Sequence, residues 1–412
     1  MIGTGGREHA LARALSLDVG ASEVHVAPGN PGMAAVATLH DVDPMAGDDV
    51  AALAEKLGVD LVVIGPEAPL VEGIADAVRD RGIACFGPTR EAAQLEGSKT
   101  FAKGVMADAG VPTAAARTCR TREEAEAALD EFGAPYVVKD DGLAAGKGVV
   151  VTDDREAALA HAVACDRVVI EEYLDGPEVS LFAITDGTTV YPLQPAQDFK
   201  RIFDGDEGPN TGGMGAYTPL LWAPDDLVEE VMRDVLQPTV AEMARRGTPF
   251  AGLLYAGLAL TSRGTRVVEF NARFGDPETQ PLLALLDSPL APLLHAAATG
   301  SLADVDPPEW KPGAALAVVM ASRGYPESSS SGDRITGVDA AEELDGVHVI
   351  HAGTATADGE LVTAGGRVLA VVATGSDLAA ARDAAYDGVA AIDFDGVQHR
   401  TDIAAKAENP GG

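Results

Sequence analysis

Lysine is scarce in this 412-residue chain, and so is positive charge as a whole. The chain has 30 Lys plus Arg residues against 64 Asp plus Glu, a formal net charge of −34, and only eight of the 30 are lysines. Nucleic acids and anionic membrane surfaces are bound by basic faces. We therefore expect neither a nucleic acid nor a membrane among the partners of this protein.

Cysteine and long apolar runs are also scarce. The three cysteines, Cys85, Cys119 and Cys165, lie far apart in no metal-binding spacing, which favours reduced thiols and a cytoplasmic protein. The longest apolar run, Phe250 to Leu260, is too short and too interrupted by glycine to span a bilayer. No charged and then apolar leader opens the sequence, so we expect no secretion. The length predicts about two to four domains.

The acidic residues are dispersed along the chain rather than gathered in a tail. Repulsion between so many like charges is screened when the Debye length falls to about 3 Å, which happens at roughly 1 M salt. We hypothesise a halophilic protein that works in a cytoplasm of molar salt. Full stability at low KCl, measured as melting temperature and activity against KCl concentration, would contradict this hypothesis.

A glycine-rich hairpin stands out against the lysine-poor background. Residues 136–152 read YVVKDDGLAAGKGVVVT, in which β-branched runs flank a loop that contains Gly142 and Gly146. Lys139 ends the first strand and Lys147 lies in the loop. Glycine lets backbone N–H groups close on an oxyanion and lysine adds charge, so the loop suits a polyphosphate. The alternative is a flexible turn with incidental lysines. The Walker pattern is absent, since only three residues separate the two glycines and glycine follows the loop lysine.

The N-terminal quarter predicts a parallel α/β sheet. Strand-like runs at 24–27, 61–64 and 84–86 alternate with helical stretches at 49–57 and 70–81. Ligands of such sheets bind at the carboxyl ends of the strands, so the loops after these runs are candidate binding loops.

A glycine loop opens the chain. The segment GTGGREH precedes a predicted helix, Ala10 to Leu17, and a glycine loop at a helix N-terminus suits an anion such as phosphate. Only Met1 and Ile2 precede this loop, so we expect a truncated first strand. The loop fails as a dinucleotide fingerprint because Glu8 occupies the third glycine position, which argues against an NAD-dependent oxidoreductase.

A second chemical centre is RVVEFNARFGDPETQ, residues 266–280. Side chains alternate along a strand, so Val268 and Phe270 are expected to face a core. By the same alternation Glu269 and Asn271 face the other side together. A carboxylate and an amide oxygen are hard ligands suited to Mg²⁺, although such a pair alone also fits a solvated face. Further charged residues in the following turn favour an active site; they are Arg273, Asp276 and Glu278.

The remaining segments predict a lid, a long loop and a last domain. Residues 112–185 read as a small α+β unit that suits a lid, and Thr121 with Glu124 predicts a capping box for one of its helices. Residues 197–217 read as a long polar loop of a functional kind. Beyond a proline-rich linker at 304–312, the predicted elements are strands at 314–321, 347–351 and 368–374 and a helix at 378–386.

These motifs together resemble those of the ATP-grasp ligases, and closely those of the phosphoribosylamine–glycine ligase (glycinamide ribonucleotide synthetase) family. The segments that carry the resemblance span nearly the whole chain in family order: GTGGREHA, VAPGNPG, GPEAPL, FGPT, AAQLEGSK, KDDGLAAGKGV, VIEEYLDGPE, QDFKR, GPNTGGMGAY, VVEFNARFGDPETQP, HAGT and GGRVL. The resemblance implies an α/β and α+β multidomain fold. Its expected parts are a Rossmann-like N-terminal domain at 1–97, ATP-grasp domains at 98–303 with a lid at about 112–185, and a small mixed α/β C-terminal domain at 312–412.

The resemblance also implies a reaction. ATP, glycine and 5-phosphoribosylamine would give glycinamide ribonucleotide, ADP and phosphate through a glycyl phosphate, the second step of de novo purine biosynthesis. The implied cofactors are ATP and Mg²⁺ or Mn²⁺. Both co-substrates are small molecules, and a monomer is favoured while the oligomeric state is left open.

The family pattern implies a role for each matching residue. The implied metal ligands are Glu269 and Asn271. The implied nucleotide-binding residues are Lys99, Lys139, Gly146, Lys147, Glu171, Tyr173, Leu174 and Glu178. The implied substrate-binding residues are Gly5, Gly6, Glu67, Asp198, Lys200, Arg273, Asp276 and Glu278. The implied catalytic residues are Arg273, Lys147 and Asp276, with Arg273 stabilising the acyl phosphate.

The sequence departs from the family pattern at two further places. Asp140 stands where the family usually has a small residue, and the segment 163–167 is shorter than usual and lacks a glycine-aromatic lid loop. One alternative is a biotin-carboxylase-like or other purine-pathway ATP-grasp enzyme, which shares the domain order but not NTGGMGAY or RFGDPETQ. Another is a non-catalytic nucleotide-binding protein, against which the intact set Glu269, Asn271 and Arg273 argues.

Overall fold

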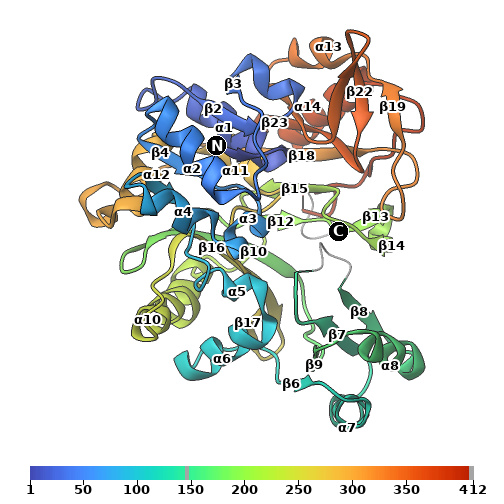
Figure 1. The fold of residues 1–412 in the computed structure, drawn as a ribbon. Coiled ribbons are helices and arrows are strands. Elements are labelled where there is room, and N and C mark those ends of the chain that lie inside the picture. Colours follow the sequence, from blue (N-terminus) through green and yellow to red (C-terminus); the bar gives the residue numbers. More distant parts are fainter. Residues whose placement is uncertain (144–147, 408–412) are drawn as a thin grey trace.

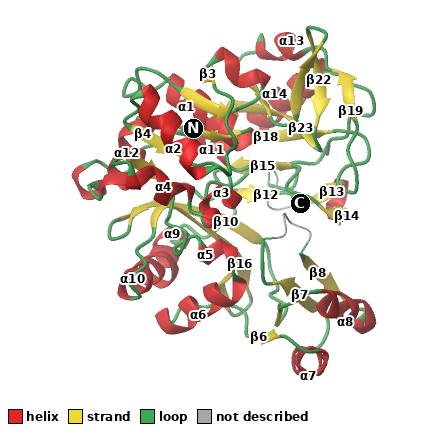
Figure 2. Ribbon diagram, viewed as in Figure 1, coloured by secondary structure: helices red, strands yellow, loops and turns green. Residues whose placement is uncertain are grey.

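The computed structural model describes residues 1–143 and 148–407 and shows several α/β units arranged around a central antiparallel sheet (Figures 1 and 2). In the N-terminal unit, β1 pairs in parallel with β2, β2 with β3, and β4 with β5. A parallel bridge from Ile2 to Ile64 joins the two sets of strands. The predicted parallel α/β sheet is therefore confirmed, although β1 has only two residues. The elements are β1 (Ile2–Gly3), α1 (Gly6–Ser16), β2 (His25–Pro28), η1 (Pro31–Ala35), β3 (Thr38–Leu39), α2 (Gly47–Leu57), β4 (Leu61–Val63), α3 (Glu67–Glu72), α4 (Ile74–Asp80) and β5 (Ala84–Phe86).

Two helices of this unit differ from the prediction. Helix α1 begins at Gly6 rather than Ala10, because the carboxylate of Glu8 accepts a hydrogen bond from the backbone N–H of Gly5 at 2.7 Å and caps the helix. The predicted helix over 70–81 is broken into α3 and α4 at Gly73, whose φ of +85° is a left-handed conformation that favours glycine.

The lid is a separate four-stranded sheet in the order β6-β9-β7-β8, with its own small core around Leu129, Val138 and Leu159. It projects away from the other units (Figure 1, dark green). The predicted hairpin is confirmed by antiparallel pairing of Val137 with Val151, and the predicted capping box at Thr121 is also present. The elements leading into and forming the lid are α5 (Gln94–Gly97), α6 (Lys99–Ala109), β6 (Ala116–Cys119), α7 (Arg122–Phe132), β7 (Tyr136–Asp140), β8 (Val149–Thr152), α8 (Arg155–Ala164) and β9 (Val168–Glu171).

The central sheet has the order β11-β10-β16-β17 and is antiparallel throughout. The predicted lid range, about 112–185, includes most of strand β10. This strand instead pairs with β16 along its whole length and so belongs to the central sheet. The prediction that Val268 faces the core is wrong. A β-bulge places Gly257 opposite Glu269 and Leu258 opposite Val267, so Val268 is the extra residue and Val267 packs in the core in its place. The strands are β10 (Glu178–Asp186), β11 (Val190–Pro192), β16 (Ala251–Thr261) and β17 (Gly264–Asn271).

The polar stretch 197–217 is not a loop without regular structure. It forms an exposed hairpin of β13 and β14 and an antiparallel pair of β12 and β15. The prediction failed because these strands are too short to show a period in the sequence. The elements from here to the next strand of the central sheet are β12 (Gln197–Asp198), β13 (Arg201–Phe203), η2 (Asp204–Asp206), β14 (Glu207–Asn210), β15 (Gly215–Thr218), α9 (Leu227–Val231), the π-helical turn η3 (Met232–Leu236) and α10 (Gln237–Arg245).

The C-terminal sheet has the order β12-β15-β18-β23-β20 and therefore takes its first two strands from the polar stretch. Pairing of β15 with β18 brings the loop at 211–213 beside the start of β23. In the part of the chain that the structure describes, no helix has the length and apolar character needed to cross a membrane. The elements are α11 (Thr279–Leu285), α12 (Leu290–Thr299), η4 (Leu302–Asp304), β18 (Ala314–Ala321), β19 (Ser331–Arg334), α13 (Val338–Glu342), β20 (Val347–His351), β21 (Thr354–Ala357), β22 (Glu360–Ala364), β23 (Arg367–Gly375) and α14 (Leu378–Ala391).

Candidate active site

A buried chain of charges lies where the lid meets the central sheet. The Nζ of Lys139 on β7 lies 2.9 Å from one carboxylate oxygen of Glu171 on β9 and donates to the carbonyl of Val268 at 3.2 Å. The Nζ of Lys103 on α6 lies 3.0 Å from the other oxygen of Glu171. Glu171 and Lys139 are both buried. Val268 is the extra residue of the bulge in β17, and its carbonyl accepts a hydrogen bond from Lys139 of the lid.

Glu269 faces the lysines of this region. Burial opposes ionisation of Glu269, but the ammonium groups of Lys200, Lys139 and Lys99 outweigh it and lower the pKa of the carboxyl. The Nζ of Lys99 on α6 donates to the carbonyl of Gly142 in the lid at 3.1 Å. Charges from α6, β7 and the polar stretch therefore all act on one carboxylate of β17.

Glu269 and Asn271 fit a magnesium ion that is completed by other oxygens. They lie two residues apart on β17, opposite Gly257 and Tyr255 of β16, so both side chains are on the same face of the sheet. Among the described residues, no cluster of three or more His, Cys, Asp or Glu side chains is placed to hold a metal ion by itself. Mg²⁺ commonly takes one or two protein oxygens and completes its shell from phosphate and water, which is what this pair allows.

Arg273 is held by carboxylates from two other elements. Its Nε donates to Glu67 at 3.1 Å and its Nη2 lies 2.9 Å from an oxygen of Glu96. The same Nη2 donates to the side-chain oxygen of Asn271 at 3.3 Å. The other oxygen of Glu96 accepts the backbone N–H of Ala272 at 2.7 Å. Against the effect of burial, Glu96 and Glu67 raise the pKa of Arg273, so the guanidinium is a permanent cation beside the metal-ligand pair.

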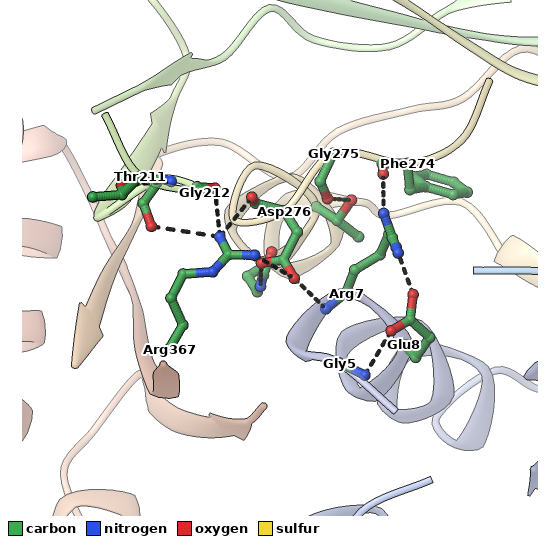
Figure 3. A network of polar contacts seen from close by, with 12 residues as sticks. Gly5, Arg7, Glu8, Thr211, Gly212, Phe274, Gly275, Asp276 and Arg367 are labelled. Carbon is green, nitrogen blue, oxygen red and sulfur yellow. Dashed lines mark hydrogen bonds and ion pairs between the residues drawn. The ribbon is translucent and has the colours of Figure 1, made fainter. Parts of the chain in front are cut away.

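Asp276 joins the N-terminal and C-terminal units (Figure 3). One of its oxygens accepts the backbone N–H of Arg7 at 3.4 Å and lies 3.3 Å from the Nη2 of Arg367. The Nη1 of Arg367 also donates to the carbonyls of Gly212 and Asp276 at 2.6 and 2.8 Å. Burial opposes ionisation of Asp276, but the guanidinium groups of Arg367 and Arg7 lower its pKa. Three distant segments of the chain therefore meet at one carboxylate.

Lys200 and Asp198 lie on the polar stretch, close to the central sheet. The ammonium of Lys200 pairs with the carboxylate of Glu178 at the start of β10. Burial raises the pKa of Asp198 to about 7, against the opposing effect of Lys200. Glu278 is buried and accepts hydrogen bonds from Tyr255 at 2.7 Å and from Ser180 at 3.1 Å. Glu278 is thus bound within the central sheet, whereas Lys200 is half-buried.

The remaining predicted site residues are placed as follows. Gly5 and Gly6 lie at the N-terminus of α1, where a Cβ on Gly6 would come within 3.0 Å of the Nε2 of Gln280. Tyr173 is exposed and Leu174 half-buried in the segment after β9. Gly146 and Lys147 lie outside the described residues, so their predicted roles stay predictions.

Four charged residues in these contacts were not among the predicted site residues; they are Glu96, Lys103, Arg367 and Arg7, the last of which lies within the quoted family motif GTGGREHA. Glu96 and Arg367 lie within quoted family motifs, AAQLEGSK and GGRVL, and that position was the only available signal. Lys103 is one of only eight lysines and follows Lys99 by one helical turn, which places both on one face of α6.

The fold and this set of charged residues define an ATP-grasp enzyme. A lid sheet and a central sheet border the lysines and the hard-oxygen pair, and a parallel α/β unit precedes them. The fold is similar to that of the biotin carboxylase domain of a 2-oxoglutarate carboxylase from Hydrogenobacter thermophilus, with a TM-score of 0.70 over 97% of this chain and 90% of that chain. The identity is 18%, so this likeness shows the fold alone.

The family follows from closer matches. The models of the phosphoribosylglycinamide synthetase N domain, ATP-grasp (A) domain and C domain match residues 1–96, 97–279 and 315–406. A phosphoribosylamine–glycine ligase of Streptomyces coelicolor is 67% identical over 99% of this chain and 98% of its own length, and one of Leifsonia xyli is 56% identical over 99% of each. The crystal structure of a phosphoribosylamine–glycine ligase from Thermotoga maritima matches with a TM-score of 0.84 and 34% identity over 98% of this chain and 99% of that one. The chain belongs to the phosphoribosylglycinamide synthetase family.

Proposed function

We propose that this enzyme joins glycine to 5-phosphoribosylamine, with ATP as the energy source, and forms glycinamide ribonucleotide, ADP and phosphate in the second step of de novo purine biosynthesis. The family and its curated ligases support this reaction. The observation that carries it in the structure is the contact of the buried Lys139 with Glu171 and with the carbonyl of Val268, the residue before Glu269 on β17. A lysine for phosphates is thereby held next to the strand that carries a carboxylate for a metal ion, a pairing that an ATP-dependent ligase requires.

The site divides into two halves. The nucleotide half consists of Lys99, Lys103, Lys139 and Glu171. The substrate half consists of Arg7, Glu67, Glu96, Arg273, Asp276 and Arg367. Glu269 and Asn271 lie between them on β17.

In the nucleotide half, Lys99 and Lys139 bind the triphosphate, and the segment from Glu171 to Leu174 lies against the adenine. Glu269 and Asn271 would hold Mg²⁺, which fits their oxygen donors. When bound, the ion neutralises charge that develops on the transferring phosphoryl group. Lys139 supplies its positive charge from a buried position, where charge counts for more than in bulk solvent.

In the substrate half, the carboxylate oxygen of glycine attacks the γ-phosphorus of ATP and ADP leaves. The amine nitrogen of phosphoribosylamine then attacks the acyl carbon of glycyl phosphate, and phosphate leaves as the nitrogen loses a proton. Arg273 stabilises the acyl phosphate, because Glu67 and Glu96 hold its guanidinium beside Asn271. Asp276, Asp198, Lys200 and Glu278 orient the amine and the phosphoribosyl group together with Gly5, Gly6 and Glu67.

We place the enzyme in the cytoplasm as a monomer that uses Mg²⁺ or Mn²⁺. The molar-salt hypothesis stays a prediction for the KCl titration. The biotin-carboxylase-like alternative shares the fold of this chain but not its family.

An ADP-release assay with each co-substrate omitted in turn tests the reaction. ADP should form only when ATP, Mg²⁺, glycine and phosphoribosylamine are all present, and glycinamide ribonucleotide should form in equal amount. ADP release that depends on bicarbonate instead of glycine would favour a carboxylase. The absence of turnover together with tight ATP binding would favour a non-catalytic nucleotide-binding protein.

A further inference from the structure

Two lysines, the buried Lys139 and the partly buried Lys103, share one carboxylate in the nucleotide half, but they differ in their remaining contacts. The Nζ of Lys103 has three acceptors: Glu171 at 3.0 Å, and the side-chain oxygen of Thr113 and the carbonyl of Ala114, both at 2.9 Å. An ammonium group has three N–H donors, so Lys103 has none to spare. Lys139 contacts only Glu171 at 2.9 Å and the carbonyl of Val268 at 3.2 Å among the described residues. Lys139 therefore keeps one donor for a ligand.

The acceptors of Lys103 are themselves fixed. The hydroxyl of Thr113 donates to the carbonyl of Val267 at 2.6 Å, and a parallel bridge joins the same two residues. The position of Lys103 is thus set by the junction between α6, the entry to the lid and the central sheet. From that position it reaches one oxygen of Glu171 and leaves the other to Lys139.

The sharing changes the charge that a phosphate meets. Two ammonium groups and one carboxylate carry a net charge of +1 at this point, whereas Lys139 and Glu171 alone would carry zero. A carboxylate with two free oxygens also accepts two donors from one ammonium group more readily than a carboxylate that is already half-occupied. Lys103 therefore limits how far Glu171 neutralises Lys139.

We propose that Lys103 is a positioning residue for the nucleotide phosphates, which it serves by occupying one oxygen of Glu171 so that Lys139 keeps a positive charge and a free donor for the triphosphate. The inference rests on the proposed function, in which Lys139 binds the triphosphate. Lys103 itself touches no phosphate in this arrangement, because all its donors are used within the protein.

The first test is Lys103→Met, which keeps an unbranched side chain one atom shorter and removes the charge. We expect the KM for ATP to rise about tenfold, equivalent to about 1.4 kcal/mol, while the KM values for glycine and phosphoribosylamine stay within about twofold. Lys56→Met, at an exposed lysine on α2, is the matched control and should leave all three values unchanged. Lys103→Arg keeps the charge and should restore most of the ATP affinity.

The decisive test is rescue by a second substitution. Glu171→Gln in the Lys103→Met background returns the local charge to +1, so the ATP affinity should recover toward that of the unmodified enzyme. Glu171→Gln alone raises the charge to +2 and should tighten ATP binding further. The ratio of the Kd for adenosine to the Kd for ATP isolates the phosphates, because any change in the adenine contacts enters both values.

The outcomes separate this inference from the function on which it rests. A purely packing role for Lys103 predicts that the double variant melts lower and binds ATP no better than Lys103→Met, and that result would overturn the inference. Lys139→Met tests the proposed function: unchanged ATP affinity in that variant would remove Lys139 from the triphosphate site. If Lys103→Met fails to fold, Lys103→Gln, which can keep hydrogen bonds to Thr113 and Ala114 but carries no charge, gives the same test, and an unchanged ATP affinity in that variant would overturn the inference.

Discussion

The two halves of the site hold their cations in different ways. In the nucleotide half, Lys139 contacts two acceptors and keeps one donor free among the described residues. In the substrate half, Arg273 contacts four acceptors, which are Glu67, Glu96, Asn271 and the carbonyl of Phe274. Arg273 is therefore held in place by the protein before any ligand binds, whereas Lys139 has one N–H that a ligand can accept.

This difference assigns different kinetic consequences to the two halves. A fixed guanidinium costs no reorganisation when charge develops on an acyl phosphate, so its loss should lower kcat. The free N–H of Lys139 contributes to phosphate binding, so substitutions around Lys139 should change the affinity for ATP. Substitutions in the substrate half should therefore change kcat, and substitutions in the nucleotide half should change the affinity for ATP.

Removal of the guanidinium at 273 should have the largest effect. Arg273→Ala should lower kcat for ADP release by about 10³-fold, because it deletes the fixed charge beside the reacting groups. Arg273→Lys should recover only part of the loss, since an ammonium group cannot reach Glu67 and Glu96 with the same fork. The Kd for ATP should change by less than about threefold in both variants.

Two results would break the comparison at this point. Normal turnover by Arg273→Ala would remove the arginine from catalysis and reopen the non-catalytic alternative. A large loss of ATP affinity at unchanged kcat would place Arg273 in the nucleotide half. Melting temperatures decide whether the variant is folded, because the change leaves the buried carboxylate of Glu96 without its cation.

Glu269→Gln should have the second largest effect. Loss of the carboxylate weakens the hard-oxygen pair, so the Mg²⁺ concentration for half-maximal ADP release should rise by about 100-fold, and excess Mg²⁺ should restore part of the rate. A Mg²⁺ titration measures this directly. Glu229→Gln, at an exposed carboxylate on α9, is the matched control and should leave the titration unchanged. A lower rate with an unchanged Mg²⁺ requirement would exclude Glu269 as a ligand.

Glu96→Gln should have a smaller effect on the same half. The amide keeps a hydrogen bond to Ala272 or Arg273 but removes the charge that holds the guanidinium, so kcat should fall about tenfold at unchanged Kd for ATP. Glu91→Gln, at an exposed residue just before α5, provides the control. Equal loss in both variants, or a loss confined to ATP affinity, would show that Glu96 does not act through Arg273.

Sequence reasoning succeeded where one segment decides its own structure. The lid hairpin follows from two β-branched runs around glycines, and the capping box at Thr121 follows from a hydroxyl and a carboxylate three residues apart. The common face of Glu269 and Asn271 follows from strand alternation, which the bulge before Glu269 leaves intact. In each case the signal lies within a few residues.

Sequence reasoning failed where a distant segment decides the outcome. The two oxygens of Glu171 on β9 are shared by lysines from two other elements, α6 and β7. The contact of Asp276 with the backbone of Arg7 spans 269 residues. No local pattern encodes such pairs, because they arise only when separately folded units pack together.

Lowering the pH should destabilise the substrate half of the site before the nucleotide half. Three histidines lie between α1 and β20; burial lowers the pKa of His9 to about 3, of His348 to about 3 and of His351 to about 4. The unfolded chain takes up protons below about pH 6.5 while these folded histidines stay neutral. Their contribution to stability is therefore present above pH 6.5 and is lost as the pH falls toward 4, at about 1.4 kcal/mol per pH unit for each group.

His9→Asn tests one share of this loss. The Nδ1 of His9 accepts the backbone N–H of His351 at 2.8 Å, and the side-chain oxygen of asparagine can accept the same bond without titrating. The fall in melting temperature between pH 7 and pH 5 should be shallower in this variant than in the parent. His295→Asn, at an exposed histidine on α12, should keep the parental slope. An unchanged slope of melting temperature against pH in His9→Asn would mean that His9 does not contribute to the loss of stability in acid.

The three histidines lie close to the substrate half of the site. His9 lies two residues after Arg7 on α1, so protonation at the α1–β20 contact loosens the helix that carries part of the substrate half. The lid histidine His161, on α8, lies by the carbonyl of Gly148 and away from the α1–β20 contact, and the charges of the nucleotide half lie on α6, β7 and β9. As the pH is lowered from 7 to 5, turnover should therefore fall before the binding of ATP does. Loss of both at the same pH would show that the two halves are one cooperative unit, and earlier loss of ATP binding would reverse the order of their stabilities.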